Sequence, residues 1–141
     1  MTVTTTPHLN FRGDARAALE FYHSVFGGQL VVLTNEDAHS VEAPAEAQHV
    51  KFGQVLGENG FQIMAYDVPA SLAYDQGEKS LFVSVRGDSV EQIEELWGRL
   101  VEGSTIVEDL APSFFSPAYG MLRDAFGVVW VLDVAAAYSP A

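Results

Sequence analysis

The chain has 141 residues, of which 48% are hydrophobic, so it can fill the core of one domain and is too short for two of ordinary size. Lysine and arginine number 7 against 19 aspartates and glutamates, which gives a formal net charge of −12 at pH 7. A chain this acidic offers no general surface for phosphates, so we expect neither nucleic acid nor an anionic membrane as a partner.

The chain contains no cysteine, which excludes disulfides, thiolate metal sites and cysteine nucleophiles. Residues 1–6 show neither the basic stretch nor the apolar segment of a signal peptide. No apolar run approaches the roughly 18 residues of a membrane span. We therefore expect a soluble, cytoplasmic protein.

The first half of the chain, about residues 7–66, predicts a strand, a helix and three further strands. Residues 8–11 alternate between polar and apolar, and Asp14 then suits a helix N-cap. Apolar residues spaced by three and four predict a helix over residues 17–25, which the glycines at 27 and 28 end. A strand at residues 30–34, an acidic loop at 35–47 and a β-hairpin at 48–66 follow.

The second half, about residues 80–134, repeats this order. A strand is predicted at residues 80–85 and a helix from about 90 to 100, with strands near 105–107, 119–122 and 128–134. Arg-Gly-Asp follows the first strand of both halves, at 12–14 and at 86–88. The repeated order predicts two βαβββ units in an α+β fold.

Strand alternation indicates which side chains each helix leaves uncovered. Leu9 and Phe11 suit the face beneath the first helix, and Leu81, Val83 and Val85 suit the face beneath the second. The opposite faces would carry His8, Asn10 and Arg12 in the first half, Ser80, Phe82 and Ser84 in the second half, and His49 and Lys51 opposite Val50 and Phe52. Such a polar concave face is typical of a ligand cavity.

Several motifs resemble one known family. The residues 8–14 (His-Leu-Asn-Phe-Arg-Gly-Asp), 18–22 (Ala-Leu-Glu-Phe-Tyr) and 25–28 (Val-Phe-Gly-Gly), with Tyr-Gly-Met at 119–121 and Asp-Ala-Phe-Gly-Val-Val-Trp at 124–130, are similar to vicinal oxygen chelate proteins. This superfamily includes glyoxalases, bleomycin-resistance proteins and extradiol dioxygenases, and the PhnB-like subgroup is the most similar. The resemblance implies one glyoxalase-like domain over residues 1–141, in which two βαβββ modules form cupped mixed β-sheets.

The superfamily typically holds one divalent metal in this cup, with ligands on the first strand and on a later strand of each half. His8 falls at the first of these positions. The others fall near Ser80 or Phe82, near Lys51, and at Val131, which are not usual ligands. We therefore expect no cofactor.

If a divalent metal is nevertheless present, we expect His8, His49 and Asp133 to hold it. His8 has two alternatives, a ligand or acid–base group and a polar cavity wall. Lys51 has three, an anion-binding group, a cation that takes the place of the metal charge and a paired lysine. The residues that we expect to contact a ligand are His8, Asn10, His49, Lys51, Met64, Tyr66, Phe82, Ser84, Phe114 and Trp130.

Two of these candidates have structural alternatives. Trp130 suits a core position as well as ligand stacking, and Phe114 suits packing on the sheet edge as well as closure over the cup. We expect a protein of unknown specificity that binds a small organic molecule in the cup, as bleomycin-resistance relatives do. The alternative is a metal-dependent lyase, isomerase or dioxygenase with an atypical metal site.

The PhnB-like subgroup often carries a methyltransferase label, which this sequence does not support, because it has no Gly-rich nucleotide-binding turn. We expect a homodimer, since open sheet edges are usually covered or paired and relatives commonly dimerise.

Overall fold

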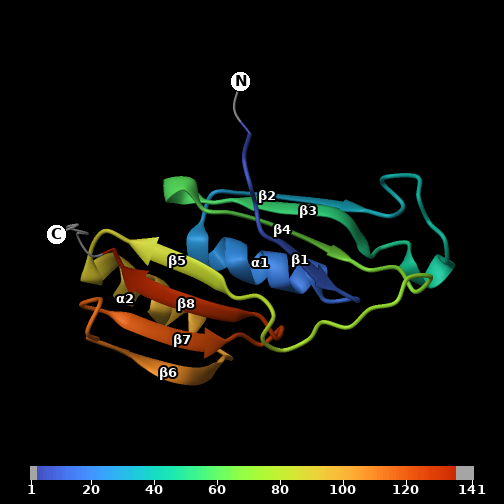
Figure 1. Cartoon of the computed structure of the whole chain (residues 1–141). Helices are drawn as coiled ribbons and strands as arrows, with labels where there is room; N and C mark the ends of the chain where they lie inside the picture. Colours follow the sequence, from blue (N-terminus) through green and yellow to red (C-terminus); the bar gives the residue numbers. More distant parts are fainter. Residues whose placement is uncertain (1–2, 136–141) are drawn as a thin grey trace. The chain divides into compact units, whose positions relative to one another are not determined.

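The computed structural model describes residues 3–135 and divides the chain into two compact units, with the boundary between Gln76 and Gly77. Each unit contains one strand, one helix and three further strands, in that order (Figure 1). The predicted α+β fold of two βαβββ modules is therefore confirmed. Among the described residues, no helix combines the length and the apolar character that crossing a lipid bilayer requires.

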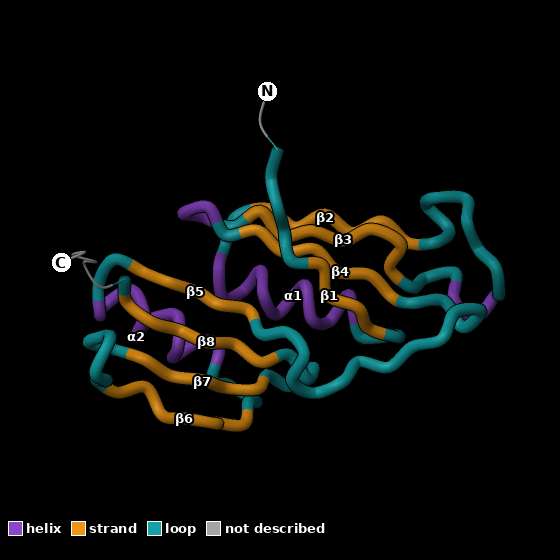
Figure 2. Tube along the Cα trace, viewed as in Figure 1, coloured by secondary structure: helices purple, strands orange, loops and turns teal. Residues whose placement is uncertain are grey.

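The first unit is a mixed four-stranded sheet with a helix along one face (Figure 2). The strand order is β1-β4-β3-β2, with β1 parallel to β4 and the other neighbours antiparallel. The elements are β1 (His8–Phe11), α1 (Ala15–Phe26), β2 (Gln29–Thr34), β3 (Val50–Leu56) and β4 (Gln62–Asp67), with short 3-10 turns at Pro44–Glu46 and Glu58–Gly60.

The core of the first unit lies between α1 and the sheet. Val55 of β3 and Ile63 of β4 are fully buried on the face against which the helix packs. Leu19 of α1 is fully buried as well, and it lies so close to Gly53 that a Cβ there would clash with its side chain. The amphipathic helix predicted from its spacing therefore covers the face that strand alternation assigned to it.

The start of α1 depends on a buried carboxylate from the last strand. Asp14 occupies the N-cap position, but its side chain makes no capping hydrogen bond. Asp67 instead accepts hydrogen bonds through Oδ1 from the N–H groups of Gly13 (2.6 Å) and Ala15 (3.1 Å), and through Oδ2 from the N–H of Val50 (2.9 Å). One side chain of β4 thus joins the first turn of α1 to β3.

The acidic loop after β2 is tied down by buried polar side chains. Asn35 Nδ2 donates to Glu46 O (2.8 Å), and Glu46 Oε2 accepts from the N–H of Ala70 (2.9 Å). Asp37 Oδ2 accepts from Thr34 N–H, and Thr34 Oγ1 accepts from Asp37 N–H, both at 3.0 Å. Hydrogen bonding to Thr34, first through its backbone N–H and then through its side chain, holds the pKa of Asp37 below its ordinary value of 3.8.

The second unit has the strand order β5-β8-β7-β6, again with the first and last strands parallel. Its elements are β5 (Val83–Gly87), α2 (Val90–Leu100), β6 (Thr105–Ala111), β7 (Tyr119–Arg123) and β8 (Val129–Val134). Ser89 and Gln92 form a reciprocal capping box at the start of α2. A Cβ at Gly120 would lie 2.8 Å from the Trp97 ring, so α2 packs closely on β7.

The first strand of this unit is shorter than the sequence predicted. Strand β5 begins at Val83, where it pairs with Trp130, and β8 itself begins only at Val129. Residues 80–82 lie outside the ladder with β8, and their alternation of polar and apolar residues does not extend the strand. Leu81, which we expected beneath α2, is 81% exposed, so that prediction was wrong.

Candidate functional site

The face of the first sheet opposite α1 carries amide, aromatic and aliphatic side chains. Its central row crosses the whole sheet, because Val31 pairs with Gln54, Gln54 with Met64, and Met64 with His8. Cross-strand partners and alternate residues along a strand share one face. The other residues on this face, which we call the open face, are Asn10, Gln29, Leu33, Phe52, Leu56, Gln62 and Tyr66.

His8 is exposed on the open face, as strand alternation predicted. Its Nδ1 lies 3.0 Å from Asn10 Oδ1, and its ring meets the ring of Tyr66 edge-on at a centroid distance of 5.2 Å. Because an amide oxygen only accepts hydrogen bonds, this contact holds the proton of the neutral imidazole on Nδ1. Nε2 is then an acceptor that a ligand hydroxyl or amide N–H can reach.

Two residues that the sequence argument did not assign to the site hold β1 in place. The Tyr74 hydroxyl donates to Asn10 O (3.0 Å), and the Arg12 guanidinium lies 5.2 Å from the centre of the Tyr74 ring. Arg12 also donates to the backbone carbonyls of Pro69 (3.1 Å) and Leu72. Burial raises the pKa of the Tyr74 phenol, so it remains a donor at neutral pH.

A β-bulge at the start of β3 changes which side chains reach the open face. The register pairs Phe52 with Leu33 but Val50 with Thr34, which leaves Lys51 as the extra residue. Val50 is therefore buried on the side of α1, whereas Phe52 lies on the open face. This corrects the prediction that both share one face. Lys51 is exposed within the bulge.

His49 precedes the bulge and has one buried ring nitrogen. Its backbone N–H donates to Glu46 O (3.1 Å), and its carbonyl accepts from Asn35 N–H (2.9 Å). Nδ1 is buried and has no hydrogen-bond partner among the residues that the structure describes. Leaving a buried polar atom unpaired costs about 1–3 kcal/mol, so this nitrogen would gain from a ligand or a water. Contact of His49 with a ligand stays a prediction.

The candidates in the second unit are dispersed. Ser84 is exposed on the face opposite α2, and Phe82 precedes β5 with an exposed fraction of 42%. Phe114 is fully exposed in the loop between β6 and β7. Trp130 is fully buried on the side of α2, and its Nε1 donates to Asp124 Oδ2 (2.9 Å). That is the core position which the sequence left open as the alternative to ligand stacking.

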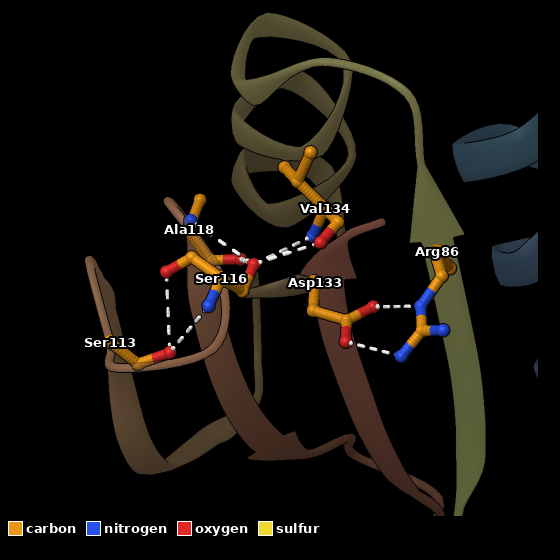
Figure 3. Close-up of polar contacts among 6 residues, drawn as sticks. All are labelled: Arg86, Ser113, Ser116, Ala118, Asp133 and Val134. Atoms are coloured by element: carbon orange, nitrogen blue, oxygen red, sulfur yellow. Dashed lines mark hydrogen bonds and ion pairs between the residues drawn. The ribbon is translucent and has the colours of Figure 1, made fainter. Parts of the chain in front are cut away.

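Figure 3 shows a charged pair of the second unit that sequence reasoning missed. Arg86 Nε donates to Asp133 Oδ1 (3.0 Å) and Nη2 donates to Oδ2 (2.9 Å), with the arginine side chain 63% exposed and the aspartate 7%. These hydrogen bonds hold the pKa of Arg86 above its ordinary value. The signal was present, because alternation from Ser84 places Arg86 on the same face.

The loop between β6 and β7 is pinned to β8 by serine hydroxyls (Figure 3). Ser116 Oγ accepts from the N–H of Val134 (3.0 Å), and Ser113 Oγ accepts from the N–H of Ser116 (3.1 Å). Phe115, which is 56% exposed, meets Tyr119 edge-on at a centroid distance of 4.9 Å. The hydrogen bonds of Ser113 and Ser116 thus fix the backbone of the loop on either side of Phe115.

The donor groups proposed for a divalent metal do not fit one. Within residues 3–135, no three histidine, aspartate or glutamate side chains are grouped as metal ligands. Both carboxylate oxygens of Asp133 accept from Arg86, and one nitrogen of His8 contacts Asn10. The set His8, His49 and Asp133 is therefore not supported as a metal site, and the divalent metal common in the resembled superfamily is not confirmed for this chain.

Comparisons with known proteins agree with the predicted resemblance. A crystal structure of protein PA1353 from Pseudomonas aeruginosa is similar with a TM-score of 0.81 and 29% identity, covering 95% of this chain and 98% of that one. A PhnB protein from Bacillus cereus, provisionally described as a 3-demethylubiquinone-9 3-methyltransferase, has a TM-score of 0.71 and 25% identity over 94% of this chain and 100% of its own. Protein YjdN from Escherichia coli (strain K12) is 21% identical over 137 residues, which are 92% of this chain and 93% of YjdN.

The family model of the glyoxalase/bleomycin resistance protein/dioxygenase superfamily matches residues 6–132, which include every strand but the last two residues of β8. The chain therefore belongs to the glyoxalase/bleomycin resistance protein/dioxygenase superfamily.

Proposed function

We propose that the protein binds a small organic molecule on the open face of its first sheet, with His8 as the main polar contact. The observation that carries the proposal is the pairing of His8 Nδ1 with Asn10 Oδ1, which leaves Nε2 as an exposed acceptor beside the Tyr66 ring. Membership of a superfamily that includes bleomycin-resistance proteins supports binding without fixing the specificity.

The surroundings of His8 suit a ligand with a flat apolar part. Phe52, Met64 and Tyr66 are half-buried on the open face, so their side chains are partly accessible and partly held by the sheet. Binding sites for small molecules commonly combine such apolar walls with a few polar groups that fix orientation. His49 and Lys51, at the start of β3, remain candidates for further polar contacts.

The test is a screen of aromatic fragments by ligand-observed NMR, followed by titration of each hit against the wild type, His8→Ala and His23→Ala. His23 lies on α1, which covers the other face of the sheet. Loss of one desolvated hydrogen bond costs about 1–3 kcal/mol, so His8→Ala should weaken binding about 5- to 150-fold and His23→Ala should not. Hits whose affinity is the same in all three proteins would refute the proposal.

The superfamily also contains dioxygenases, and the alternative function is a metal-dependent lyase, isomerase or dioxygenase with an atypical metal site. Metal analysis of protein purified without a histidine tag separates the two functions. The binding proposal expects substoichiometric metal. Stoichiometric zinc, manganese, iron or nickel would favour the enzyme, with the exposed Nε2 of His8 as the first ligand to examine.

We also propose that the two units act as one glyoxalase-like domain over residues 1–141 and that the chain forms a homodimer. The dimer proposal rests on the strands at the edges of both sheets, β1, β2, β5 and β6, each of which has a neighbouring strand on one side only within its sheet. Sedimentation at micromolar concentration should give twice the mass of the chain, and a monomer would contradict the proposal. The cytoplasmic location stays a prediction.

A further inference from the structure

Carboxamide side chains are concentrated on the open face of the first sheet. Asn10, Gln29, Gln54 and Gln62 all lie there, spread over its strands. Gln54 occupies the central row, where Val31 and Met64 are its cross-strand neighbours. A carboxamide is neutral and offers both an acceptor and two donor hydrogens.

The hydrogen bonds already made on this face determine which polar atoms are still available to a ligand. Thr6 Oγ1 donates to Gln62 Oε1 (3.1 Å), and His8 Nδ1 contacts Asn10 Oδ1 (3.0 Å). The amide oxygens of both residues are thus engaged, and their NH₂ groups remain as donors. Gln54 is half-buried and makes no side-chain hydrogen bond to any residue of the described chain. A half-buried amide without a partner is a group that a ligand can satisfy.

The open face carries no carboxylate, although the chain has 19 aspartates and glutamates. Its nearest cations in sequence, Arg12 and Lys51, lie outside its cross-strand rows. Arg12 is engaged with backbone carbonyls and the Tyr74 ring, and Lys51 projects from the bulge as an exposed side chain. The face of the second sheet opposite α2 differs, because it carries the Arg86–Asp133 pair.

We propose that the open face selects an uncharged ligand that carries an amide or similar group with both a carbonyl and an N–H. The ligand carbonyl accepts from the NH₂ groups of Asn10, Gln54 or Gln62, and its N–H donates to His8 Nε2. A charged group of the same shape would lose water without meeting an opposite charge, which disfavours it. This inference rests on the proposed function and names the ligand class of the same site.

Three molecules of nearly identical shape test the charge preference: benzamide, benzoate and benzamidinium, with charges of zero, minus one and plus one. Each is titrated into ¹⁵N-labelled protein, and the side-chain NH₂ signals of Asn10, Gln54 and Gln62 are followed with the backbone amides. We expect benzamide to shift these signals and to bind at least about 5-fold more tightly than either charged analogue, the effect of about one hydrogen bond. Tighter binding of benzoate or benzamidinium would overturn the proposal.

Gln54→Met removes the central carboxamide while keeping a side chain of similar length. The ratio of benzamide to benzoate affinity should fall about 5-fold or more in this variant. Gln48→Met is the matched control, because Gln48 is exposed outside the open face and its amide donates to Glu36 Oε2. An unchanged ratio in Gln54→Met, or an equal fall in Gln48→Met, would refute the role of the carboxamides.

The failure of this inference is distinguishable from failure of the proposed function. If none of the three molecules shifts the signals of the open face while other aromatic fragments do, the amide class is wrong and binding at the face stands. If no fragment of the wider screen shifts these signals, both proposals are wrong. The ¹⁵N spectrum of each variant reports in the same experiment whether the fold is retained.

Discussion

Replacement of Asp67 by alanine should be among the most damaging single changes in the first unit. Asp67 is 4% exposed, and its carboxylate accepts hydrogen bonds from the backbone N–H groups of Gly13, Ala15 and Val50. The hydrogen bonds of Ala15 and Val50 are buried, so water does not replace the lost acceptor there without entering the core. The change therefore leaves backbone N–H groups without a hydrogen-bond acceptor at the start of α1 and at the start of β3.

The expected magnitude follows from these contacts. A hydrogen bond to a charged group contributes about 1.5–3 kcal/mol, and a buried donor left unpaired costs about 1–3 kcal/mol. Because such terms are not additive, we expect Asp67→Ala to lower the free energy of unfolding by about 3–5 kcal/mol. Asp67→Asn keeps one acceptor but turns an NH₂ group toward one of the N–H donors, so about 1–3 kcal/mol is expected. Domains of this size are stable by only about 5–15 kcal/mol.

Urea unfolding at pH 7 measures these losses, and Asp14→Asn is the matched control. Asp14 lies between Gly13 and Ala15, the two residues at the start of α1 that Asp67 contacts. It is exposed, and its side chain makes no capping hydrogen bond. Both substitutions to asparagine remove one negative charge near the N-terminus of α1, so their difference isolates the buried hydrogen bonds. Asp14→Asn should change stability by no more than about 0.5–1 kcal/mol. Equal losses at the two positions would show that the carboxylate of Asp67 does not organise this junction.

Two further predictions concern charged groups elsewhere. Arg86→Ala removes the cation that pairs with the mostly buried carboxylate of Asp133, so it should lower the free energy of unfolding more than Arg99→Ala, whose partner is exposed and whose loss should cost at most about 0.5 kcal/mol. Urea unfolding of both variants decides, and similar losses would contradict the argument. The pKa of Asp37 is lowered by its hydrogen bonds to Thr34, so its stabilising contribution is complete above pH 3.8 and is lost as the pH falls further. A carboxyl ¹³C titration should give a midpoint below 3.8, and a midpoint above it would refute the hydrogen-bond assignment.

Local periodicity was sufficient to predict the two βαβββ modules and the exposed position of His8. In α2, Ile93 and Leu100 are fully buried, two helical turns apart on one face. Alternation along residues 8–11 placed His8 and Asn10 on the same face, and the structure confirms it. Each of these features depends on side-chain spacing within one short segment, which a single sequence displays directly.

Features that depend on a distant partner were not predictable in this way. The extent of β5 is the extent of its pairing with β8, and the alternation at Leu81 carried no information about that pairing. The capping of α1 by Asp67 joins positions that are 52 residues apart at Ala15. The role of Arg12 likewise depends on the carbonyls of a segment that follows β4. Tertiary contacts of this kind leave no local pattern.

The bulge at Lys51 determines which residues of β3 lie on each face of the first sheet. Residues before it and after it belong to opposite alternation patterns, so Val50 is buried on the helix side while Phe52 lies on the open face. Deleting Lys51 would make Val50 and Phe52 neighbours opposite Thr34 and Leu33, so ordinary alternation would keep both residues on their present faces. In alignments of relatives, a match that counts residues across this point therefore assigns ligand positions to the wrong face unless both chains carry the extra residue. Loss of the extra residue here is therefore a change in chain length that leaves the same side chains on each face, whereas deletion of a regularly paired residue of β3 would exchange them.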